Sequence, residues 1–251
     1  GGMQIELTLA NADEALFPFS ASRDYSIEQA QMRMSTVSID SALQNSFNAA
    51  LLSGKALQFY IKTIHLQQQN LPASRTECQV SMVRALSRLA GLFISFTGPA
   101  TFLAADGTIQ NTDLGHTQLH KSFLNPSAIT PGIDGSADES LMSWQVQIGG
   151  KNWPEASPAS SLAETFSLLR QAIGTIDESV RTISIHENGY RNLSFVAGMP
   201  LQTIVGMPFA SVNTRSGDLL TVKFSGLDPA ARSASRIFVH MVAETIIEVR
   251  E

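Results

Sequence analysis

The sequence predicts an all-β fold: a jelly-roll sandwich of two antiparallel sheets with two or three short inserted helices. Two observations predict it. Apolar, β-branched and aromatic residues recur at every second position in some nine or ten short segments, which is the spacing of strands that bury one face. These segments do not alternate regularly with helices, which disfavours a parallel α/β sheet. A jelly roll tolerates helices and long loops between its strands.

In the first half of the chain, one short helix interrupts the strand pattern. Asp40 can cap a helix whose apolar residues include Leu43 and Phe47, and Gly54 can end it. A second helical turn is predicted at residues 84–91. A change in the phase of alternation predicts a β-bulge near Ser35 and Thr36. Strands are predicted at residues 5–9, 30–39, 57–66, 78–82 and 92–96.

The second half contains the helix with the clearest end signals. Ser161 and Glu164 have capping-box spacing, and Gly174 is placed to end the helix. Between them, one apolar stripe is formed by Leu162, Phe166, Leu169 and Ile173. Strands are predicted at residues 144–148, 182–186, 192–197, 209–212, 219–224 and 237–249.

We expect residues 1–251 to form a single jelly-roll-like domain. The main irregularity is a long loop excursion at about residues 98–143, from Gly98 to Ser143. It has little periodicity and many Asp, Asn, Thr and Ser residues. Loops of this length in a compact domain are functional, form interfaces or are partly disordered.

Charge and hydropathy limit the possible partners. Charged residues make up only 16% of the chain, against about 25% in ordinary globular proteins. Much of the surface is therefore neutral and polar, or buried in contacts between subunits. The 17 basic residues form no run, so we expect no direct nucleic-acid binding. No stretch of about 18 apolar residues and no leader pattern is present, so neither a membrane span nor a signal peptide is expected.

Few residues are arranged for chemistry. His116 and His120 have the i, i+4 spacing of metal ligands on a helix, with Asp113 nearby, but Thr117 stands where a hydrolytic metal motif has glutamate. Their segment is predicted to be a loop. Cys78 is the only cysteine and is interpreted as a buried small apolar residue. We therefore expect no catalytic residue, no metal site and no cofactor.

The other histidines and the aromatic residues have simpler interpretations. His65, His186 and His240 lie inside strand patterns, where a sheet surface or a hydrogen-bonded core position is expected. Trp144 is predicted to be a core strand residue. Trp153, before Pro154, is predicted to be a turn or interface anchor.

Several blocks of sequence resemble the C-terminal jelly roll of the major capsid proteins of double-jelly-roll DNA viruses. The resemblance lies in the order and the general residue character of these blocks, and it covers about two thirds of the chain. A full double jelly roll is longer than 251 residues, so the chain is similar to one of the two rolls, a trimmed domain or a single-roll relative. The blocks are residues 37–57, 80–96, 143–154 (SWQVQIGGKNWP), 162–174 (LAETFSLLRQAIG), 213–224 (NTRSGDLLTVKF) and 236–251.

This resemblance implies a structural viral capsid protein that self-assembles into an icosahedral-type shell. Its partners would be copies of itself, with a trimer implied, and other capsid proteins. It would be located in the virion after assembly in the host cytoplasm or nucleus. Two alternatives stay open. One is a carbohydrate- or receptor-binding jelly roll with Trp144, Trp153 and Tyr190 on its ligand face, and the other is an enzyme with a metal held by His116 and His120.

Overall fold

The computed structural model divides the chain into two compact units, residues 1–55 with 101–117 and residues 56–100 with 118–251. Each unit is described by itself. The residues that the structure describes are 6–9, 25–31, 33, 37–72, 74–98, 123–127, 129–131, 137–140, 142–176, 185, 190, 194–202, 210–215, 219–229 and 234–249.

The first unit contains helix α2 (Ser41–Leu52). The predicted cap is confirmed, because the Asp40 carboxylate accepts a hydrogen bond from the Ala42 N–H at 3.1 Å. Gly54 follows the helix with a φ of +77°, a conformation that glycine adopts without strain. The strand predicted at residues 5–9 is wrong for the part described. Residues 6–9 form no strand, since a period-two pattern makes a strand only where another strand pairs with it.

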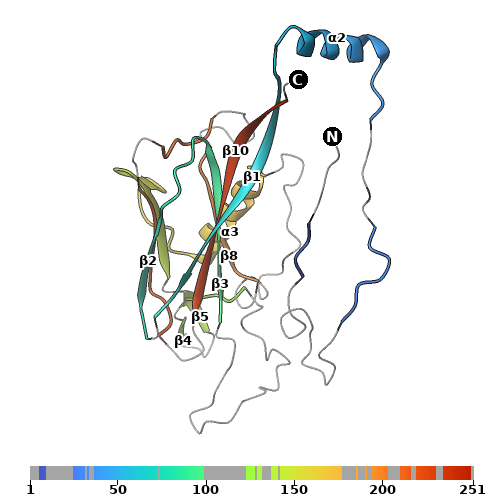
Figure 1. Ribbon diagram of the computed structural model, residues 1–251. Coiled ribbons are helices and arrows are strands. Elements are labelled where there is room, and N and C mark those ends of the chain that lie inside the picture. The colour runs from blue at the N-terminus through green and yellow to red at the C-terminus, as the bar shows by residue number, and fades with distance from the viewer. Residues whose placement is uncertain are drawn as a thin grey trace. The chain divides into compact units, whose positions relative to one another are not determined.

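The second unit contains the remaining elements (Figure 1). In chain order they are β1 (Leu57–Asn70), β2 (Glu77–Met82), β3 (Leu89–Thr97), β4 (Ile129–Pro131), β5 (Ala137–Ser140), β6 (Ser143–Ile148), β7 (Lys151–Trp153), α3 (Leu162–Ile173), β8 (Val196–Pro200), β9 (Leu220–Ser225) and β10 (Arg236–Val249).

The strand order is that of a jelly roll. The first sheet has the order β1-β10-β3-β8 and the second has the order β2-β9-β6-β7. The eight strands of the sandwich pair from the outside of the sequence inward: β1 with β10, β2 with β9, β3 with β8, and β6 with β7. All these pairs are antiparallel. This is a long antiparallel ribbon rolled up on itself, so the predicted jelly-roll sandwich is confirmed.

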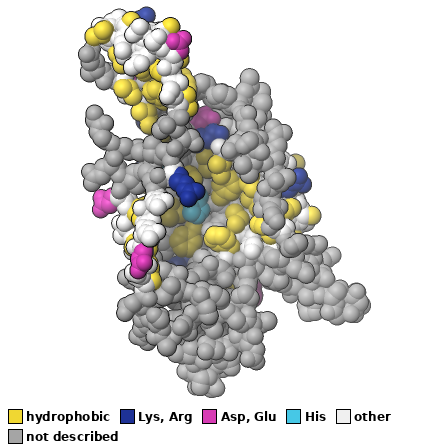
Figure 2. Space-filling view, turned by 90° about the vertical axis from the view of Figure 1, so that its right-hand side faces the viewer, with side chains coloured by type: hydrophobic (Ala, Val, Ile, Leu, Met, Phe, Trp, Pro, Cys, Tyr) yellow, Lys and Arg dark blue, Asp and Glu magenta, His cyan; other side chains and the backbone are white. Residues whose placement is uncertain are grey.

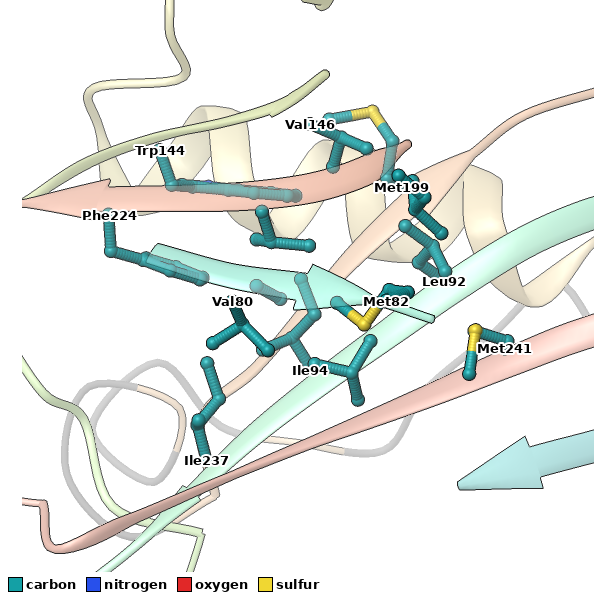
Figure 3. Packing of buried hydrophobic residues seen from close by; sticks show 14 of the residues in the cluster. Val80, Met82, Leu92, Ile94, Trp144, Val146, Met199, Phe224, Ile237 and Met241 are labelled. Carbon is teal, nitrogen blue, oxygen red and sulfur yellow. The ribbon is translucent and has the colours of Figure 1, made fainter. Parts of the chain in front are cut away.

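The core lies between the two sheets (Figure 3). Phe224 is its centre, because Trp144 stacks on it at 5.7 Å between ring centroids and Phe96 meets it edge-on at 5.0 Å. Burying each such side chain stabilises the fold by about 1.5–3 kcal/mol. Figure 3 shows side chains of both sheets pointing toward one another, from Val80, Met82, Trp144, Val146 and Phe224 in the second sheet and from Leu92, Ile94, Met199, Ile237 and Met241 in the first.

Helix α3 packs on β8, at the far side of the first sheet from β1. Its predicted cap is confirmed, since Ser161 Oγ accepts from the Glu164 N–H at 3.0 Å. Gly174 follows the helix but keeps a right-handed conformation, so its flexibility is not what ends the helix. The contact with β8 requires a glycine. A Cβ at Gly198 would lie 2.8 Å from the Leu169 Cα and 3.0 Å from the Ala172 Cβ.

The helical turn predicted at residues 84–91 is wrong. This segment approaches β3 in an irregular conformation, and β3 already begins at Leu89. The reason is a long-range contact. Thr214 Oγ1 accepts from the Leu86 N–H at 2.8 Å and donates to the Leu86 carbonyl at 3.1 Å, which gives the backbone partners outside a helix.

Other differences concern strand ends. β1 continues to Asn70 through the polar residues 67–70, because β10 pairs with all of it. The strand predicted at 144–148 turns at Gly149 and Gly150 and returns as β7, which the sequence pattern did not indicate. β4 and β5 lie within the predicted excursion. The predicted bulge at residues 35–36, the strand at 182–186 apart from residue 185, and most of the excursion at 98–143 fall outside the described residues. The strand predicted at 209–212 is wrong for the part described, because residues 210–212 form only an isolated bridge between Val212 and Leu89.

The Gly198 contact gives a test of how α3 is held. We expect Gly198→Ala to destabilise the protein by about 1–3 kcal/mol, because the added methyl group pushes the helix away from β8. Gly150→Ala is the matched control, since no atom lies within 4 Å of its Cβ position, and we expect a change within about 0.5 kcal/mol. Urea unfolding measures both. Equal stability of the two variants would contradict the close packing of α3 on β8.

Candidate functional site

The most unusual surface of the sandwich unit is strand β1. Among the strands that the structure describes, it is the outermost of the first sheet and has β10 as its only neighbour there. The register between them is unbroken over all 14 residues, from Leu57 opposite Val249 to Asn70 opposite Arg236. The other side of β1 is therefore a sheet edge. An edge presents backbone N–H and C=O groups that can pair with another strand.

β1 carries apolar side chains on both of its faces. Gln67 points toward the second sheet, because its Nε2 donates to the Ser81 carbonyl at 2.8 Å, so odd-numbered β1 residues face inward. Even-numbered residues face outward. The exposed apolar residues belong to both sets, with exposed fractions of 51% for Phe59, 58% for Tyr60, 39% for Ile61, 60% for Ile64 and 54% for Leu66.

One end of β1 extends beyond the rest of its sheet (Figure 1). β3 pairs with β10 only between Arg236 and Ala243, whereas β1 pairs with β10 as far as Val249. The first part of β1 and the last part of β10 therefore form a two-stranded ribbon. Ile247 and Val249 are each 44% exposed on it. A two-stranded ribbon is marginally stable in water without further packing, so this part of the fold lacks a covering partner within the sheet.

Charge is nearly absent from β1. Lys62 is its only formally charged residue, and it lies opposite Glu244 in β10. The Lys62 Nζ donates to the Ile176 carbonyl at 3.1 Å, just after α3. Gln58 Nε2 donates to the Glu248 carboxylate at 3.0 Å. Gln58 and Lys62 thus have partners within the chain, whereas the apolar side chains of β1 are exposed.

The outward face of the first sheet continues this apolar surface from β1 onto β10 and β3. His240 lies opposite Leu66 of β1 and Phe93 of β3, and all three belong to the outward-facing set. Burial lowers the pKa of the His240 imidazole below its ordinary value. Figure 2 shows hydrophobic side chains gathered on the side of the molecule where β1 and β10 lie in Figure 1.

The second sheet has a different outward face, with an open depression of about 390 Å³. Gln79, Gln145 and Lys223 line it from three adjacent strands. Gln145 Nε2 is held by the Pro154 carbonyl at 2.8 Å. Trp144 and Phe224 also border the depression, but their rings are buried and stack on each other in the core.

The aromatic residues proposed for a ligand face lie mostly in the interior. Trp144 is 1% exposed and its Nε1 donates to Thr165 Oγ1 at 3.1 Å, so the prediction of a core strand residue is confirmed. Tyr190 is 4% exposed and its hydroxyl donates to the Val196 carbonyl at 3.0 Å. Burial raises the pKa of the Tyr190 phenol. Trp153 is half-buried against the core. These rings do not form one exposed platform.

The histidines are only partly described. Asp113, His116 and His120, which were considered for a metal site, lie outside the described residues, as does His186. Within the part of the chain that is described, no three His, Cys, Asp or Glu side chains gather as a metal site would require. His65 is half-buried, with its Nε2 3.4 Å from Thr63 Oγ1.

Cys78 lies in β2 and packs partly against the core. Burial raises the pKa of its thiol to about 11, so the group stays protonated and unreactive near neutral pH. This agrees with the interpretation of Cys78 as a small apolar residue.

No protein-family model matches the sequence, and no curated protein matches it. Solved structures similar to the chain include the PBCV-1 virus capsid (11% identity, TM-score 0.47, 85% of this chain and 53% of that chain). Also similar are the major capsid protein P2 of bacteriophage PM2 (10%, TM-score 0.38, 76% and 45%) and the Faustovirus major capsid protein (8%, TM-score 0.46, 82% and 36%). The chain thus spans about half or less of the length of these proteins. Neither described helix has the length and apolar character needed to cross a membrane.

The pKa of His240 gives a testable pH dependence. In the unfolded chain the imidazole titrates near 6.5, whereas burial lowers its pKa in the fold. The unfolded chain therefore binds more protons below pH 6.5, so the contribution of His240 to stability is complete above 6.5 and is lost as pH falls toward the folded-state pKa.

We expect the free energy of unfolding to fall on acidification from about pH 7.5 to about pH 5.5, and His240→Gln to remove part of that fall. Urea unfolding of both proteins at the two pH values measures it. An identical fall in the wild type and the variant would show that another group is responsible.

Proposed function

We propose that the chain is a structural capsid subunit that self-associates to build a shell, without catalysis. The observation that carries the proposal is the exposed apolar surface of β1 on a jelly roll that buries a large apolar core between its sheets. Ile64 at 60% and Leu66 at 54% exposure lie in regular strand structure, where a soluble monomer would place polar residues. Contact with another subunit would bury them.

The fold and the sequence support the same proposal. Jelly rolls serve viral capsids, lectins and cupins. The burial of Trp144 and Tyr190 weighs against a sugar-binding platform, which needs exposed rings. Of the six sequence blocks that resemble capsid proteins, 143–154 covers the β6–β7 hairpin, 162–174 covers α3, 236–251 covers β10 and 213–224 covers β9 up to its last residue.

The proposal extends to organisation and partners. Residues 1–251 would act as one jelly-roll-like subunit, with the excursion at about 98–143 available for contacts between subunits. Its partners would be copies of itself, in a trimer or a related assembly, and other capsid proteins. Its place would be the virion, after assembly in the host cytoplasm or nucleus. Direct contact with nucleic acid is not part of the proposal, since the basic residues form no run.

Self-association is directly measurable. We expect the purified protein to form a symmetric oligomer whose mass by light scattering is a fixed multiple of 27.1 kDa. Negative-stain images of concentrated samples should show rings, sheets or closed particles. A strict monomer at every concentration, with the predicted secondary structure intact by circular dichroism, would contradict the proposed function.

A further inference from the structure

We infer that β1 pairs along its free edge with β1 of a second copy of this chain, so that the first sheets of two subunits form one continuous sheet. The inference rests on the proposed function and adds the contact through which two subunits meet. It starts from the length of the edge. β1 has 14 residues in unbroken register, which corresponds to a strand of about 48 Å.

β1 has none of the features that protect sheet edges in monomeric proteins. Short length, proline, bulges and several charges are the usual protection. β1 contains no proline, glycine or acidic residue, and Lys62 is its single formal charge. Its register with β10 has no bulge. Such an edge pairs with another strand when one is available.

The occupant that fits this edge is an identical strand. The other sheet edges among the described strands are much shorter: β2 has six residues, β8 five, β5 four, and β4 and β7 three each. β2 includes Glu77 and β7 includes Lys151, whereas β8 ends at Pro200. Of these edges, only β1 itself can supply a partner as long as β1.

The charges also favour two copies of β1. The chain has a formal net charge of −5, but β1 contains none of its acidic residues, so two β1 strands do not bring like acidic charges together. Lys62 lies opposite Glu244 of its own β10, and its Nζ donates to the Ile176 carbonyl of its own chain. A two-fold contact places the same residues on both sides, and a strand without acidic residues can meet its own copy without repulsion between carboxylates.

Pairing would also cover the apolar groups that the single chain leaves exposed. Inward-facing Phe59 and Ile61 and outward-facing Ile64 and Leu66 would each meet side chains of the second strand on the same face. The two-stranded ribbon, in which the start of β1 pairs with the end of β10, would gain β1 of the second copy as a third strand. Three or more strands are what a free-standing ribbon needs for stability, so the contact supplies what this part of the fold lacks.

The test uses the full chain with two lysine substitutions, Ile64→Lys and Leu66→Lys together. Both side chains are more than half exposed, so the fold of the single chain should be kept. We expect association to weaken by at least about tenfold, because each lysine replaces apolar contact in both copies. The matched control is Val83→Lys with Leu219→Lys. These residues are 90% and 54% exposed, lie outside β1 and should leave association unchanged.

Hydrogen exchange then distinguishes strand pairing from other contacts at this face. In a single chain, alternate β1 amides bond to β10 and the others point to the free edge. When the wild-type protein associates, pairing should slow the exchange of the amides at the free edge by at least about tenfold. The same amides should change little in the Ile64→Lys, Leu66→Lys variant.

Each outcome bears on one claim. The inference is supported if the β1 variant associates more weakly while the control variant does not, and if the free-edge amides of β1 exchange more slowly in the wild-type oligomer. Unchanged association of the β1 variant, or alternate β1 amides that stay fast in the wild-type oligomer, overturns the inference and leaves the proposed function standing. A wild-type protein that remains monomeric overturns the proposed function itself.

Discussion

The fold depends on the pairing of its first and last long strands. β1 and β10 are 14 residues each and pair over their whole length, although they lie at opposite ends of the sandwich unit in sequence. This pairing closes the ribbon from which the roll is made, and it brings the inward-facing residues of β10 over the core of the second sheet. The same pairing also determines which strand edge stays unpaired within the sheet. Because β10 takes one side of β1, the other side becomes the longest sheet edge among the described strands, and it carries exposed apolar side chains.

The sequence predicted best the features that neighbouring residues determine. The caps of α2 and α3 at Asp40 and Ser161 were identified correctly because a cap needs only its own turn. The strands β2, β6, β9 and β10 were found from their alternation. The prediction failed where distant residues decide the structure. Thr214 holds the backbone at Leu86 out of the predicted helix, and pairing with β10 extends β1 through a polar segment that resembles a loop.

The candidate site was harder to predict than the fold. The interior position of Trp144 followed from the strand pattern, but the exposure of Phe59, Ile64 and Leu66 did not. An apolar residue in a strand is expected to face a core, and only the strand order places β1 at an edge. A signal was present all the same. β1 has apolar residues in both phases of its alternation and one formal charge, a composition typical of a strand with neighbours on all sides. Among the described strands of one subunit, β10 is the only sheet neighbour of β1.

A cryo-electron microscopy map of the assembled wild-type protein tests the central claim most directly. The account predicts a two-fold axis at which β1 of one subunit runs antiparallel to β1 of the next, with the strands about 4.8 Å apart and the sheet continuous between subunits. A map in which β1 faces solvent, or in which a helix or a loop covers its edge, would contradict the account.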